Sequence, residues 1–157
     1  MKVLVTGISG YCGRHLAAYL AGMGHELHGI ARRVDTPAAS TLPAGTQLHR
    51  VDVEDPGGMR RCIDEVRPDI IFHLAALMPD STPPQNPWTY QQVNVHGTLE
   101  LIDAVMLSGC APVVHVAGSG AIYAPTAGEP VTEQGAFGPT SPYALSKLSQ
   151  DLFSRYA

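Results

Sequence analysis

The sequence predicts an α/β protein built on a doubly wound parallel sheet. Three observations support this fold class. Short apolar runs rich in β-branched residues alternate with helical patterns, a glycine-rich turn follows the first run, and most of the runs are nearly continuous in apolar character. Apolar runs of that kind are typical of parallel strands covered by helices on both faces. A strand, a helix and a strand in that order imply a right-handed crossover.

Five strands and four helices are expected. The strands are predicted over 2–6, 25–30, 47–53, 69–76 and 112–118. The helices are predicted over 13–24, 56–66, 88–107 and from 141 onward. Their boundaries rest on stop and start signals, namely Gly24, Asp55-Pro56, Gly109 and Ser141-Pro142. Leu16, Tyr19, Leu20 and Met23 stand at helical spacing in the first helix. Loops are expected over 34–46, 79–87 and 124–140.

Composition narrows the function classes. The chain has 157 residues, enough for one domain with a sizeable core, and a formal net charge of -4, which disfavours nucleic acid as a partner. Three widely spaced cysteines suit neither a disulfide framework nor a zinc cluster, so they are expected to be buried free thiols. The seven histidines are scattered and predict no metal site. The start "MKVLVTG" resembles neither a signal peptide nor a spanning helix, so a cytoplasmic protein without a membrane partner is expected.

The stretch "LVTGISGYCGRHLA" indicates a phosphate-binding turn at the end of the first strand. Gly7 allows a sharp turn out of the strand, Gly10 lets a pyrophosphate approach the backbone, and Gly13 lets the next helix pack closely. The helix N-terminus then offers free N–H groups to the phosphates. A dinucleotide is the ligand that needs all three features.

The end of the second strand indicates which dinucleotide is preferred. Ala31 stands where an acidic residue would bind the ribose hydroxyls of NAD, and Arg32 and Arg33 follow directly. Two guanidinium groups suit a 2′-phosphate, so NADP(H) is favoured and NAD(H) remains possible, with Asp35 as the best candidate for the ribose if NAD is bound. The alternative is that both arginines are simply solvated on a loop.

The stretch "GPTSPYALSK" predicts a helix that carries an acid/base pair. Ser141 can cap the helix and Pro142 suits its first position. This places Tyr143 in the first turn and Lys147 one turn later on the same face. A phenol is a poor base at neutral pH unless a nearby positive charge stabilises its anion, and the Lys147 ammonium can supply that charge.

Together these motifs resemble the short-chain dehydrogenase/reductase superfamily, specifically its extended branch of NAD(P)-dependent epimerases, dehydratases and reductases. The resemblance rests on six separated stretches, "TGISGYCG" (6–13), "VDVED" (51–55), "HLAA" (73–76), "VNVHGT" (93–98), "HVAGSGAIY" (115–123) and "YALSK" (143–147). The "ARR" and "PYALSK" stretches look most like the GDP-mannose dehydratase and GDP-4-keto-6-deoxymannose reductase group.

The resemblance implies a Rossmann fold with strand order 3-2-1-4-5 and a hydride-transfer enzyme that acts on a nucleotide sugar or a related small keto or hydroxy substrate. It implies that Ser119 binds the substrate oxygen, that Tyr143 transfers its proton, and that Lys147 holds the nicotinamide ribose. It also implies a homodimer formed through helices 88–107 and 141–157. The residues expected to contact the cofactor are Gly7, Ser9, Gly10, Tyr11, Cys12, Gly13, Arg32, Arg33, Asp52, Val53, Leu74, Ala75, Ala76, Asn94, Tyr143 and Lys147.

The sequence leaves two function classes open. The helical pattern is still in register at the last residue, so residues 1–157 are expected to form an NAD(P)-binding domain that lacks the usual last strands and the C-terminal substrate domain. In one hypothesis this is the cofactor-binding part of a nucleotide-sugar oxidoreductase. In the other, the natural chain ends near residue 157 and is a non-catalytic NADP-binding or interaction module.

Overall fold

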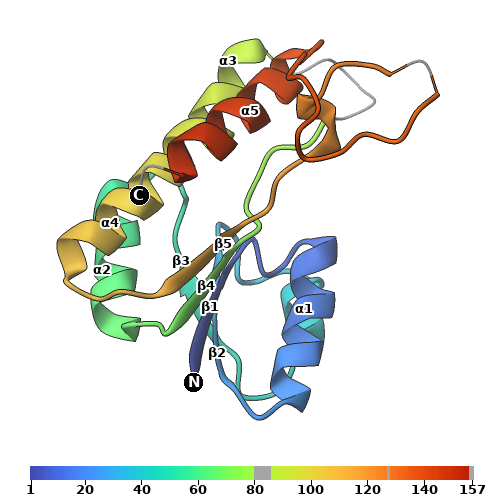
Figure 1. Cartoon of the computed structure of the whole chain (residues 1–157). Helices are drawn as coiled ribbons and strands as arrows, with labels where there is room; N and C mark the ends of the chain where they lie inside the picture. Colours follow the sequence, from blue (N-terminus) through green and yellow to red (C-terminus); the bar gives the residue numbers. More distant parts are fainter. Residues whose placement is uncertain (80–85, 127, 156–157) are drawn as a thin grey trace.

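A computed structural model describes residues 1–79, 86–126 and 128–155, and it contains a five-stranded parallel sheet in the order β3-β2-β1-β4-β5 (Figure 1). The predicted fold class and strand order are therefore confirmed. The strands are β1 (Lys2–Thr6), β2 (Glu26–Ala31), β3 (Gln47–Arg50), β4 (Ile70–His73) and β5 (Val113–Val116).

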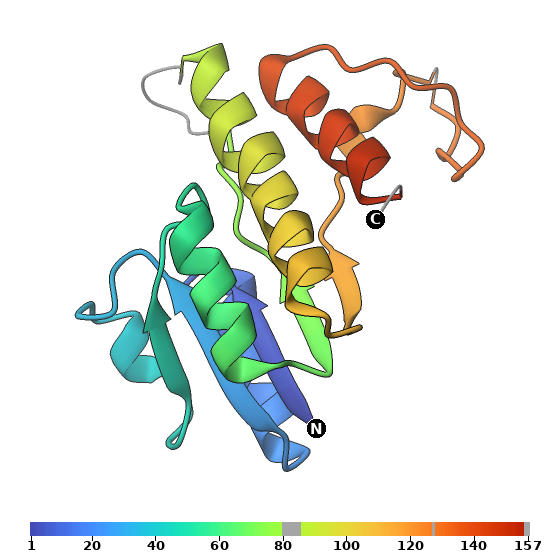
Figure 2. The ribbon, with the colours of Figure 1, turned by 90° about the vertical axis from the view of Figure 1, so that its left-hand side faces the viewer.

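Helices cover both faces of the sheet, as a doubly wound fold requires. α1 (Tyr11–Gly22) lies on one face, and α2 (Pro56–Val66) and α4 (Gly97–Ser108) lie on the other, with α5 (Pro142–Ser154) alongside α4 (Figure 2). Each face has its own apolar core. The core beneath α1 is centred on Val3, Val5, Ile8, Ala17 and Leu20, and the core beneath α2 and α4 on Leu4, Ile30, Met59, Ile63, Ile71 and Leu101.

Three predicted strands are longer than the observed ones, because each ladder ends where its neighbour ends. β1 stops at Thr6, so Leu74 N makes the last bond from the fourth strand, to Thr6 O at 3.3 Å. Ala117 N likewise makes the last bond of the fifth strand, to His73 O at 3.1 Å. Residues 51–53, 74–76 and 117–118 therefore continue as loops at the carboxyl edge.

The predicted helix 88–107 is a composite. It consists of α3 (Pro87–Tyr90), a π-helical turn η2 (Gln91–His96) and α4, and Gly109 ends it in the left-handed conformation. The wider π turn carries Asn94, which is fully buried. Such turns are frequent at functional sites.

The buried face of α1 differs from the predicted stripe. Leu20 of that stripe is buried, but Tyr19 and Met23 are exposed, and Gly13 and Ala17 join Leu20 on the buried face. The start of the helix packs so closely on the glycine-rich turn that only Gly13 fits there, and spacing alone could not show this.

The remaining segments form short turns and loops. The expected loop 34–46 contains a 3₁₀ turn, η1 (Ala39–Thr41), and the loop 124–140 pairs with residue 123 through an isolated bridge. Residues 80–85 of the expected loop 79–87, residue 127, and the last two residues of the expected helix 141–157 lie outside the described residues. Among the described helices, none combines the length and the apolar character of a membrane span.

Candidate functional site

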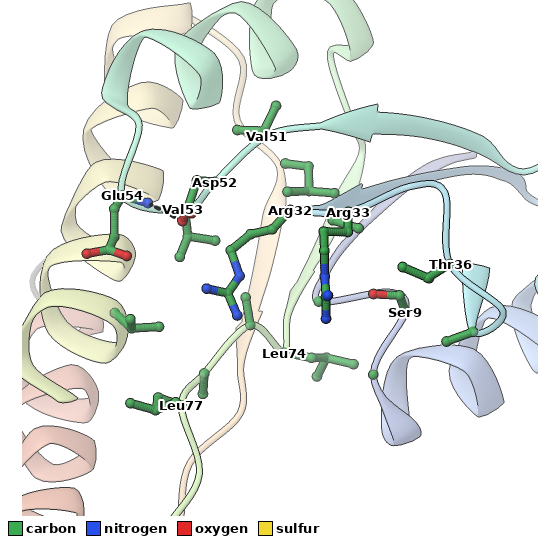
Figure 3. A pocket seen from close by; sticks show the side chains of 18 of the residues that line it. Ser9, Arg32, Arg33, Thr36, Val51, Asp52, Val53, Glu54, Leu74 and Leu77 are labelled. Atoms are coloured by element: carbon green, nitrogen blue, oxygen red, sulfur yellow. Dashed lines mark hydrogen bonds between the residues drawn. The ribbon is translucent and has the colours of Figure 1, made fainter. Parts of the chain in front are cut away.

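A cavity of about 550 Å³ opens at the carboxyl edge of the sheet (Figure 3). Its walls come from the segments that follow β1, β2, β3 and β4, together with the start of the long helix. Parallel sheets of this kind bind ligands at this edge, where the strand order reverses. The lining includes most of the predicted cofactor residues, namely Gly7, Ser9, Gly10, Arg32, Arg33, Asp52, Val53, Leu74, Ala75 and Ala76.

The glycine-rich turn has the geometry predicted for it. Gly7 has a φ of 68°, and a Cβ there would lie 2.9 Å from the backbone of Ala75. A Cβ at Gly13 would clash with the carbonyl oxygen of Gly7 and lie 2.6 Å from that of Ile8. Gly10 leads into α1, whose first turn leaves its N–H groups without intrahelical partners. The cradle therefore exists only because these positions lack side chains.

Two arginines extend into the cavity from the end of β2 (Figure 3). Arg32 and Arg33 are exposed, and the neighbouring wall is made by Ser9 and by Thr36, a residue that sequence reasoning missed. The Thr36 hydroxyl accepts a hydrogen bond from Ala39 N at 3.1 Å and so anchors η1 beside the arginines. The Thr-Pro dipeptide at 36–37 was a turn signal that could have pointed to it.

The turn after β3 supplies an acidic wall. Asp52 Oδ1 accepts a hydrogen bond from Glu54 N at 3.2 Å, which closes a local turn into α2. Glu54 lines the cavity as well, and the sequence analysis did not single it out.

Asn94 lies behind the cavity wall, not on it. Its Oδ1 accepts from Leu77 N at 2.6 Å, and its Nδ2 donates to Leu77 O at 3.1 Å and to Ser146 Oγ at 3.0 Å. Asn94 therefore holds the backbone that lines the cavity after β4. Tyr11, Cys12, Gly13, Tyr143 and Lys147 also lie outside the lining of this cavity.

The predicted acid/base pair lies on α5, which begins as expected. Ser141 Oγ accepts from Ala144 N at 3.1 Å, and Pro142 is the first helical residue. Tyr143 is buried, and its hydroxyl donates to the Sδ of Met78 at 3.4 Å. A thioether is a weak acceptor, so this hydroxyl can exchange it for a better partner.

Lys147 is held at the end of β5. Its Nζ donates to the carbonyl oxygen of Ala117 at 2.6 Å and to Gln150 Oε1. Burial lowers the pKa of Lys147 to about 8. Ser119 follows two residues after Ala117 and begins η3 (Gly120–Ile122), where its hydroxyl accepts from Ala121 N at 3.2 Å. The structure thus brings Lys147 and Ser119 to the same end of β5. The sequence analysis did not predict Gln150 as a partner of Lys147.

The expectation of buried thiols needs correction, and the scattered histidines include one close pair. The three cysteines are free, but only Cys62 is buried, and burial raises the pKa of its thiol to about 12; Cys12 is exposed. The histidines are not all isolated, because the pairing of β2 with β3 brings His28 Nδ1 within 3.1 Å of His49 Nε2. Burial, and then the nearby His28, lowers the pKa of His49. The described residues contain no cluster that could hold a metal ion.

Comparison with known families agrees with this geometry. The profile of the NAD dependent epimerase/dehydratase family matches residues 3–157, which is nearly the whole chain. The protein belongs to this family. As an epimerase/dehydratase family member it shares the extended short-chain dehydrogenase/reductase architecture inferred from the sequence.

The relatives that this family member matches include enzymes of two types. A GDP-mannose 4,6-dehydratase of Vibrio cholerae is 30% identical over 159 residues, which are 94% of this chain and 43% of that enzyme. A UDP-glucose 4-epimerase of Oryza sativa subsp. japonica is 31% identical over 155 residues, which are 93% of this chain and 42% of that enzyme. This family member thus spans less than half of either relative.

A solved structure gives the same picture. The UDP-glucose 4-epimerase of Thermus thermophilus, in complex with NAD, superposes with a TM-score of 0.88 at 31% identity. The match covers 99% of this chain and 50% of that enzyme.

Proposed function

We propose that this family member binds NADP(H) in preference to NAD(H) and acts by hydride transfer on a nucleotide sugar or a related small keto or hydroxy compound. The observation that carries the proposal is the cavity in which the glycine-rich turn faces Arg32 and Arg33. The family and its NAD-bound neighbour support a nicotinamide dinucleotide. The relatives, a GDP-mannose dehydratase and UDP-glucose epimerases, support the substrate class.

The residues present fit the dinucleotide. The cavity runs past the glycine-rich turn, which packs against the backbone of Ala75 so closely that a Cβ at Gly7 would not fit. The turn leads to the N-terminus of α1, where a pyrophosphate would bind. The side chain of Ala31, at the end of β2, has no polar atom to bind ribose hydroxyls, and Asp35 does not line the cavity. Arg32 and Arg33 can instead form charge-assisted hydrogen bonds with a 2′-phosphate.

The chain's own catalytic residues would hold and move one proton. When bound, the nicotinamide supplies hydride transfer. Tyr143 presents a hydroxyl whose present acceptor is weak, so it can donate to or accept from a substrate oxygen. With a pKa of about 8, Lys147 is mainly protonated at neutral pH, and its charge stabilises the phenolate that forms. Among the described residues, two of its three N–H groups have acceptors, and the third would donate to a ribose hydroxyl. Ser119 would bind the same substrate oxygen.

Cofactor titration tests the first part of the proposal. NADPH is expected to bind more tightly than NADH, and Arg32→Ala is expected to weaken NADPH by about tenfold or more while changing NADH little, because one charge-assisted bond contributes roughly 1.5–3 kcal/mol. Arg60→Ala, which removes an arginine from α2, is the matched control. Equal weakening of both cofactors by Arg32→Ala would show that this arginine does not read a phosphate.

Turnover tests the second part. Hydride exchange between the cofactor and a 4-keto sugar nucleotide is expected to fall by roughly 10²–10⁴ in Tyr143→Phe, because the proton-transfer group is gone. Tyr19→Phe, at an exposed position of α1, should leave it unchanged. Cofactor binding without any turnover on a panel of sugar nucleotides would favour the non-catalytic module.

A homodimer through helices 88–107 and 141–157 is part of the same proposal. Exposed apolar side chains on these helices support it, namely Trp88, Met106, Leu107, Leu145, Leu152 and Phe153. Sedimentation of the protein would test this directly, since a monomer at micromolar concentration would contradict it.

A further inference from the structure

A chain of buried polar side chains leads away from Lys147. Beyond the Lys147 ammonium, Gln150 Nε2 donates to Thr98 Oγ1 on α4 at 2.6 Å. Lys147 is 3% exposed, Gln150 1% and Thr98 not at all, so none of them can replace these partners with bulk water. Buried polar groups with complete hydrogen bonding fix a single arrangement of side chains.

The series of hydrogen-bonded side chains continues to the glycine-rich turn. Thr98 Oγ1 lies 3.0 Å from His73 Nε2, and His73 Nδ1 lies 2.8 Å from Thr6 Oγ1. Thr6 is the residue before Gly7, and its hydroxyl oxygen also accepts from Ala75 N at 3.1 Å. The polar chain therefore connects Lys147 to the residues that line the cavity.

The donor and acceptor of every hydrogen bond between Lys147 and Thr6 follow from groups that can act in only one way. An ammonium only donates, so Gln150 turns its Oε1 toward it and its NH₂ toward Thr98. The Thr98 hydroxyl donates to Asn94 O at 2.7 Å, so its oxygen accepts from both Gln150 and His73. His73 thus carries its proton on Nε2, and its Nδ1 accepts from a threonine hydroxyl. One neutral tautomer satisfies the whole network.

We propose that Gln150 is a positioning residue for Lys147, holding its ammonium at the carbonyl of Ala117 while Thr98 and His73 hold Gln150 in one orientation. A lysine side chain has a flexible four-carbon stem, and a point charge needs such a fixed acceptor to stay in one place. The inference rests on the proposed catalytic function of Lys147. Three adjacent elements supply His73, Thr98 and Gln150, and α5 also carries Tyr143 one turn before the lysine.

The environment of Lys147 can be read without any turnover. The protein has two lysines, Lys2 and Lys147, so the side-chain signals of ¹³C-labelled lysine can be assigned with one Lys2→Arg variant and followed against pH by NMR. Gln150→Glu replaces a neutral acceptor with an anion of the same shape and is expected to raise the Lys147 midpoint by about 1–3 pH units. Gln150→Met removes the acceptor and is expected to lower the midpoint.

Gln47→Glu is the matched control. It makes the same chemical change at an exposed position on β3, at the opposite edge of the sheet from β5, and should leave the Lys147 midpoint unchanged. Thr98→Ser keeps the shared hydroxyl and should retain the wild-type midpoint. An unchanged midpoint in Gln150→Glu, in a protein whose amide spectrum is native, would overturn the proposal even if Gln150→Met does not fold.

The same experiment separates this inference from the proposed function. The NMR titration needs neither cofactor nor substrate. A failure to bind NADPH would therefore contradict the proposed function, while the effect of Gln150 on the Lys147 midpoint could still be measured. Conversely, if the protein binds NADPH but the Lys147 midpoint is the same in the wild type and in the Gln150 variants, only the positioning role is contradicted. In the active enzyme, Gln150→Glu is expected to shift the alkaline limb of the pH profile of kcat in the same direction as the NMR midpoint.

Discussion

The glycine-rich turn and the surroundings of Lys147 hold their parts of the site by different means. The turn lies within eight consecutive residues, 6–13, and works through backbone conformation and the absence of side chains. Lys147 instead depends on side chains from β4, α4 and α5, joined by hydrogen bonds between residues as far as 52 positions apart. The first arrangement is sensitive to added atoms, and the second to lost hydrogen bonds or added charge.

Adding atoms to the turn is expected to have the largest effect. Gly13→Val would press its side chain against the carbonyl oxygens of Gly7 and Ile8, and neither oxygen can move without unravelling the turn. We expect the free energy of unfolding to fall by about 4 kcal/mol or more, at the upper end of overpacking effects. Urea denaturation followed by circular dichroism would measure it.

A glycine elsewhere in the same helix provides the control. A Cβ at Gly22, the last residue of α1, would meet no atom of the described residues within 4 Å. Gly22→Ala is expected to be neutral or to stabilise by up to roughly 1 kcal/mol, because alanine loses less backbone entropy in a helix. Similar losses at both glycines would show that helix propensity, and not close packing on the turn, governs α1.

This contrast also explains what the sequence could predict. Short motifs predicted their own local geometry: the sharp turn at Gly7, the Ser141 cap and the Gly109 stop were all expected and observed. The predicted ends of three strands were too far along the chain, because a strand ends where its hydrogen-bonded neighbour ends. Gln150 carried no local signal, and the stretch 93–98 indicated the family without showing that Thr98 would bind Gln150, since a glutamine or threonine on a helix is ordinarily solvated or packed.

The stability of the protein at acid pH tests the hydrogen bonds that His73 makes. Burial, and then the charge of Lys147, lowers the pKa of His73 from its usual 6.5 to about 4. The folded protein therefore keeps this imidazole neutral where the unfolded chain protonates it, so stability is lost as the pH falls from 6.5 to 4. The expected contribution is about 3 kcal/mol, at roughly 1.36 kcal/mol per pKa unit. Urea midpoints measured across this range would report it as a slope.

The substitution His73→Gln separates this slope from the general effect of protonating carboxylates. A glutamine can accept from Thr6 and donate to Thr98 as the neutral imidazole does, but it cannot gain a proton, so the acid slope should become shallower while the hydrogen bonds persist. His15→Gln, on the exposed face of α1, should leave the slope unchanged. If His73→Gln kept the full slope, the histidine would not be held neutral, and the direction assigned to the hydrogen bonds between Thr6 and Thr98 would be wrong.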